Sequence, residues 1–182
     1  NISLIILLAL IINLSSLDTI YLFNESYLID NLSNYMKIIL VGSGIFVMLT
    51  GSKYIQVINL NKIEYPILIL SSILGMMIMI SSNDLIVFYM GLELQSLALY
   101  VLATFNRDEI KSSEAGLKYF VLSALSSGLL LYGCSLIYGF TGSTNFNVIA
   151  SQLNSDQYAL TFGIVFILVG LAFKISAVPF HM

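Results

Sequence analysis

The 182-residue sequence has few charged residues, one cysteine and one histidine. Charged residues make up 9% of the chain, whereas soluble domains carry roughly 25%. The net charge of −3 also argues against the positive surface that nucleic-acid binding requires. One cysteine excludes an internal disulfide, and with one histidine no cluster for zinc or an iron–sulfur centre can form. The composition therefore excludes a soluble enzyme and a nucleic-acid-binding protein.

Hydrophobic residues instead make up 58% of the chain, and the mean hydropathy is +0.95. A chain this short has too much surface to bury so many apolar side chains in an aqueous core. The apolar residues form runs near the roughly 20 residues that a helix needs to cross a bilayer core. We therefore predict an all-α, multi-spanning membrane protein with a single transmembrane domain over residues 1–182. Its predicted spans are Ile2–Leu14, Tyr35–Tyr54, Tyr65–Ser82, Asp84–Phe105, Gly116–Phe140 and Leu160–Phe180.

The segments between the spans are polar, and their charges differ between the two sides of the predicted bundle. Most lysines and arginines lie in residues 51–64 and 106–115, which places these loops on the cytoplasmic or matrix side. Before the last span, apolar residues at helical spacing favour a short amphipathic helix near residues 146–153, with an irregular polar loop as the alternative. Pro179 lies near the end of the last span, where it would break the helix.

Three ionisable residues inside predicted spans stand out: Glu93, Lys118 and Lys174. Each costs about 2.5–3.5 kcal/mol at the centre of a membrane helix, so such residues point to a function. Counting helical rise from the span ends places Glu93 and Lys174 within about 7 Å in depth, which a lysine side chain can largely bridge. An ion pair between them is allowed if their helices touch. Because burial disfavours a charged form and an opposite charge favours it, a pair that changes partners would store and release a proton.

Simpler interpretations exist for each of these residues. Glu93 could hydrogen-bond a neighbouring helix, Lys174 could form a static pair that fixes helix packing, and Lys118 could extend to the membrane surface. His181 follows Pro179 by two residues. Its imidazole could carry protons near neutral pH, or it could only hydrogen-bond a carbonyl that a broken helix leaves free.

Three stretches, residues 91–100, 114–123 and 170–181, together point to a family. They read GLELQSLALY, EAGLKYFVLS and GLAFKISAVPFH. In this order and spacing they resemble the antiporter-like membrane subunits of respiratory complex I (NADH:ubiquinone oxidoreductase). They are more similar to the chain 2 type than to its sibling subunits. The resemblance extends from Tyr65 to Met182 and rests on hydropathy alone before that.

The resemblance implies roles in proton translocation for four residues. Glu93 matches a glutamate that switches against a lysine, Lys174 matches the lysine of a broken helix, and Lys118 matches a lysine of the helix between them. His181 matches a histidine on the family's proton path. The resemblance also implies no cofactor and no redox chemistry in this chain, because FMN, iron–sulfur clusters, NADH and ubiquinone would bind other parts of the complex.

The family fold contains two inverted units, each with a broken helix. By this resemblance we expect the chain to lack the first helix and the C-terminal half. Its expected partners are the lipid bilayer, the other membrane-arm subunits and a second chain that supplies the missing half. The expected location is the mitochondrial inner membrane, with a bacterial plasma membrane as the alternative. Two other functions stay open: a subunit of a multisubunit cation/proton antiporter, and a non-pumping structural fragment of the membrane arm.

Overall fold

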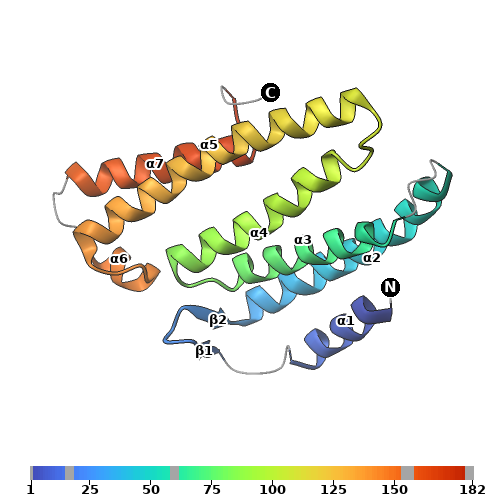
Figure 1. Ribbon diagram of the computed structural model, residues 1–182. Helices are drawn as coiled ribbons and strands as arrows, with labels where there is room; N and C mark the ends of the chain where they lie inside the picture. The colour runs from blue at the N-terminus through green and yellow to red at the C-terminus, as the bar shows by residue number, and fades with distance from the viewer. Residues whose placement is uncertain (1, 15–18, 58–61, 153–157, 179–182) are drawn as a thin grey trace.

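The computed structural model describes residues 2–14, 19–57, 62–152 and 158–178. The long helices lie side by side in chain order, and the last one returns against α5 (Figure 1). A two-stranded antiparallel hairpin connects the first two helices. The elements are α1 (Ile2–Leu14), β1 (Ile20–Leu22), β2 (Tyr27–Ile29), α2 (Asn31–Val57), α3 (Glu64–Ile80), α4 (Leu85–Ala103), α5 (Ile110–Thr141), α6 (Phe146–Gln152) and α7 (Tyr158–Lys174).

The helices follow the predicted spans closely in their middles and differ at their ends. α1 covers the same residues as the first predicted span, and α2 extends beyond the second at both ends. α5 begins at Ile110, where the predicted span begins at Gly116. Hydropathy marks only the apolar part of a helix, and the polar turn before Gly116 contains good helix formers. The short amphipathic helix α6 lies at Phe146–Gln152, with Ile149 buried.

Three of the described helices, α2, α4 and α5, are long and apolar enough to cross a membrane. α3 and α7 are also apolar, but each has 17 residues, about 26 Å of helix at 1.5 Å per residue. Large apolar side chains such as Ile39, Phe46 and Leu117 are exposed, which suits contact with lipid. Length and composition thus support three spans, and the other three predicted spans stay predictions.

α7 ends in a Schellman motif. The backbone N–H groups of Ser176 and Ala177 donate to carbonyls of the last helical turn at 3.1 and 2.9 Å. Ser176 has a φ of 52°, the left-handed conformation that glycine usually adopts at this position. The helix therefore ends at Lys174, well before the predicted Phe180, because the backbone turns there. Pro179, where the sequence predicts the break, lies outside the described residues.

Hydrogen bonds between connecting segments close one end of the helices. The Asn83 side-chain amide donates to the carbonyl of Glu25 at 2.9 Å, and the Asn83 carbonyl accepts from the N–H of Phe146 at 3.1 Å. Asp84 caps α4 by accepting from the N–H of Ile86 at 2.8 Å. At the other end, Arg107, before α5, forms an ion pair with Glu64, the first residue of α3, at 3.7 Å. The described parts of the two loops predicted to share one membrane side thus lie together.

Glycines allow the backbones of two pairs of helices to come into direct contact. A Cβ atom on Gly91 would lie 2.9 Å from the carbonyl oxygen of Gly75, where α4 crosses α3. A Cβ atom on Gly133 would lie 2.8 Å from the carbonyl oxygen of Gly163, where α5 meets α7. Small residues at such crossings permit the close packing that joins helices in a bilayer. These contacts fix the positions of α4 and α7, which carry the two buried charges.

Replacing Gly91 with alanine should destabilise the α3–α4 contact by about 1–3 kcal/mol, because the new methyl group meets backbone atoms that cannot move aside. Thermal unfolding of the purified protein in detergent measures the effect. Gly128→Ala is the matched control, since a Cβ at Gly128 in α5 has no neighbour within 4 Å. Equal unfolding midpoints for the two variants would contradict the close contact.

Candidate functional site

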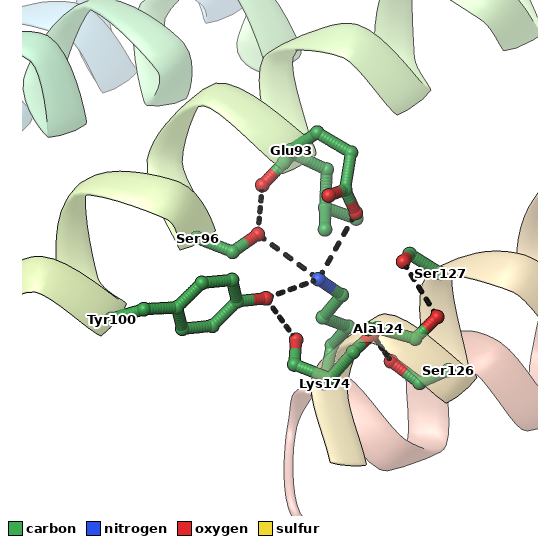
Figure 2. Close-up of polar contacts among 9 residues, drawn as sticks. Glu93, Ser96, Tyr100, Ala124, Ser126, Ser127 and Lys174 are labelled. Atoms are coloured by element: carbon green, nitrogen blue, oxygen red, sulfur yellow. Dashed lines mark hydrogen bonds and ion pairs between the residues drawn. The ribbon is translucent and has the colours of Figure 1, made fainter. Parts of the chain in front are cut away.

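The side chain of Lys174 lies against one face of α4. Its ammonium nitrogen Nζ is 3.2 Å from Oε1 of Glu93, 3.0 Å from Oγ of Ser96 and 3.2 Å from the hydroxyl of Tyr100 (Figure 2). The three partners follow one another by three and four positions, so they share a face of the helix. An ammonium has three N–H donors, and α4 offers one acceptor for each.

The lysine cluster, defined here as Glu93, Ser96, Tyr100, Ser123 and Lys174, is largely buried. The side chains of Lys174 and Glu93 are 11% and 20% exposed. The Ser96 hydroxyl donates to the carbonyl of Leu92, and the Tyr100 hydroxyl donates to the hydroxyl of Ser123 on α5. Because each hydroxyl has already given its hydrogen to another partner, both hydroxyl oxygens accept from the lysine. The arrangement therefore gives each N–H of a protonated Lys174 an acceptor on α4.

A cavity of about 200 Å³ lies beside Lys174, between α5 and the end of α7. Its polar lining includes Ser123, Ser126 and Tyr119 of α5 and Ser176 beyond α7. At about 30 Å³ per water, this volume has room for roughly six water molecules, and the hydroxyls give them hydrogen-bond partners. A buried charge and a space suited to water thus lie next to each other.

The other predicted site residues lie apart from this cluster or outside the described residues. Lys118 pairs with Glu114, four residues earlier on α5, at 2.7 Å. The two side chains are 64% and 58% exposed, so the structure does not bring Lys118 to Lys174. His181 lies outside the described residues, and its predicted role is not tested. The structure does bring Glu93 and Lys174 together, on the two helices that the depth argument selects.

Sequence reasoning missed Ser96, Tyr100 and Ser123 in the cluster. Helical spacing from Glu93 was the available signal for the first two, since both lie on its face of α4. No sequence signal distinguishes Ser123 from the other serines of α5. A further buried lysine, Lys37 of α2, has its ammonium nitrogen 5.2 Å from the centre of the Tyr27 ring.

Comparison with known proteins places this site in a family. Residues 82–182 match the NADH:quinone oxidoreductase/Mrp antiporter transmembrane family. The match covers more than half of the chain and includes Glu93, Lys118 and Lys174. The chain belongs to this family. The resemblance carried by the three sequence stretches is thereby confirmed.

Comparison with individual proteins supports the same family assignment. The chain is 69% identical over 180 residues to NADH-quinone oxidoreductase subunit N of Pelagibacter ubique, a match covering 99% of this chain and 38% of that protein. It is 27% identical to a chain of respiratory complex I from Thermus thermophilus, with a TM-score of 0.79 and the same coverage, 99% and 38%. A chain of the Mrp complex from Dietzia sp. is 24% identical, with a TM-score of 0.73 over 98% of this chain and 35% of its own, and shows a common fold. This chain thus spans about two-fifths of the relatives' length.

Replacing Glu93 with glutamine should destabilise the protein by roughly 3 kcal/mol, because it leaves the buried Lys174 charge without its opposite. Replacing Glu93 and Lys174 together with glutamine should recover most of the loss, since no unpaired charge then remains. Thermal unfolding in detergent measures both effects.

Glu114→Gln is the matched control for this prediction. It removes the carboxylate of the exposed Lys118 pair and should leave the unfolding midpoint nearly unchanged. If Glu93→Gln is equally harmless, the Glu93–Lys174 pair is not held away from water.

Proposed function

We propose that this chain forms part of a proton-translocating membrane subunit of NADH:quinone oxidoreductase, and that protons pass through Lys174. The supporting observation is the buried Glu93–Lys174 pair beside a cavity lined by hydroxyls. Apolar residues of similar size would often be as stable as a buried ion pair. A need to carry charge explains the pair better than stability does.

In this proposal, Glu93 favours the protonated form of Lys174 while the two side chains stay in contact. Energy from electron transfer elsewhere in the enzyme moves Glu93 away from the lysine. Burial then destabilises the ammonium, which gives its proton to the cavity side. When Glu93 returns, the lysine binds a new proton, and the cycle is coupled to electron transfer through the position of one carboxylate.

The proposed partners are the other membrane-arm subunits and the lipid bilayer. FMN, iron–sulfur clusters, NADH and quinone are assigned to other parts of the enzyme, and this chain is assigned no redox chemistry. The remaining helices of the antiporter-like fold would come from further sequence of the same protein or from a second chain, and the expected second chain stays a prediction. The reported relatives with named organisms are bacterial, which supports the alternative location, a bacterial plasma membrane, over the mitochondrial inner membrane.

A cation/proton antiporter subunit is the second candidate. The family includes Mrp antiporters by its description, and the fold of the Dietzia chain supports this alternative. The 69% identity to a quinone oxidoreductase subunit favours the first candidate. Purification of the native assembly distinguishes the two, since flavin and iron–sulfur subunits should accompany the chain only in the oxidoreductase.

Replacing Lys174 with methionine in the intact enzyme should lower the number of protons pumped per electron, because methionine fills a similar space without binding a proton. Proton uptake and quinone reduction, measured together in proteoliposomes, give this ratio. Lys111→Met, an exposed lysine in the first turn of α5, is the matched control. An unchanged ratio in the Lys174 variant would reject the transport role and favour a structural one.

A further inference from the structure

We propose that Tyr100 is the group through which the Lys174 proton leaves toward the cavity, an inference that rests on the proposed function above. The three acceptors around the lysine differ in their other interaction partners. Glu93 is the charge partner, and the hydroxyl of Ser96 turns back to the carbonyl of Leu92 in its own helix. Tyr100 alone among the three connects the lysine to a hydroxyl of another helix. That hydroxyl belongs to Ser123.

Ser123 lines the cavity beside the lysine, so the contacts form a continuous path. It runs from Nζ of Lys174 to the Tyr100 hydroxyl at 3.2 Å, then to the Ser123 hydroxyl and the cavity. Figure 2 shows the Tyr100 hydroxyl facing the lysine nitrogen. Each hydroxyl on this path can accept one proton while it donates another, which is the property that a relay requires.

The proposed transfer balances with water as the final acceptor. An N–H bond of Lys174 breaks and its proton joins the Tyr100 oxygen, while the hydrogen that Tyr100 donates passes to Ser123. Ser123 in turn gives its hydroxyl proton to a water molecule in the cavity. The lysine becomes a neutral amine, the water becomes a hydronium ion, and both hydroxyls are restored.

The ring of Tyr100 is fixed in place, which keeps its hydroxyl on the path. It packs edge-on against the rings of Tyr119 and Phe120 of α5, with centroids 4.8 and 5.7 Å away, and the residue is only 6% exposed. Because these contacts come from α5, the relay is complete only while α4 and α5 keep this spacing. Phenylalanine would preserve the ring contacts and remove only the hydroxyl.

The test is Tyr100→Phe in the intact enzyme, reconstituted in proteoliposomes. Loss of the relay should slow coupled proton pumping by roughly 100-fold, the range expected for a positioned proton-transfer group. The solvent deuterium isotope effect on pumping should also rise, because proton transfer becomes the slow step. A tyrosine that only packs the helices would not change the isotope effect. Tyr132→Phe is the matched control, since Tyr132 also packs edge-on, against Phe166, outside the lysine cluster.

A second pair of variants addresses the next group on the path. Ser123→Ala should reproduce the loss of pumping and Ser123→Thr, which keeps a hydroxyl, should restore it. The proposal is overturned if Tyr100→Phe and Ser123→Ala pump like Tyr132→Phe while Lys174→Met still lowers the proton-to-electron ratio. If Lys174→Met leaves that ratio unchanged, the proposed function fails and the relay fails with it.

Discussion

A charged lysine in apolar surroundings must be held by partners, and the arrangement of three helices here provides them. Glu93 and Tyr100 come from α4, Ser123 comes from α5, and Lys174 ends α7. α5 packs against both other helices, and the glycine contact with α7 brings their backbones together. Without that close approach, the lysine would not reach α4. The packing of apolar helices and the position of one charge therefore depend on the same contacts.

The end of α7 provides a second favourable interaction for the Lys174 ammonium. The Schellman motif makes Lys174 the last helical residue, where the negative end of the helix dipole favours a cation. The carboxylate of Glu93 acts in the same direction. Because two separate effects stabilise the ammonium, moving Glu93 away removes only one of them. In the proposed cycle, the remaining dipole would help the lysine to bind a proton again after each transfer.

The sequence predicts the helices and the Glu93–Lys174 pair. It does not predict which other side chains meet, because that depends on how each helix is rotated about its own axis. Depth along a helix follows from counting residues, which is why Glu93 and Lys174 can be matched from the sequence alone. Helices that are apolar on nearly all sides give no signal for which face meets a neighbour, so Ser123 could not be selected, and Tyr100 only through its helical spacing from Glu93. Lys118 shows the converse, since it falls inside a predicted span and its side chain is exposed on α5. The short strands β1 and β2 were not predicted either, because they depend on hydrogen bonds with each other and with segments distant in the sequence.

The choice of hydroxyls around the lysine also bears on how a proton can leave. A second carboxylate at Tyr100 would hold the ammonium so strongly that release would require a large rearrangement. A hydroxyl accepts from a protonated lysine and can donate to a neutral amine after the proton has gone. Rotation of one O–H bond therefore suits Tyr100 to both charge states, while its ring stays fixed against α5. Under the proposed function, a site built in this way would change its charge with little movement of the helices that carry it.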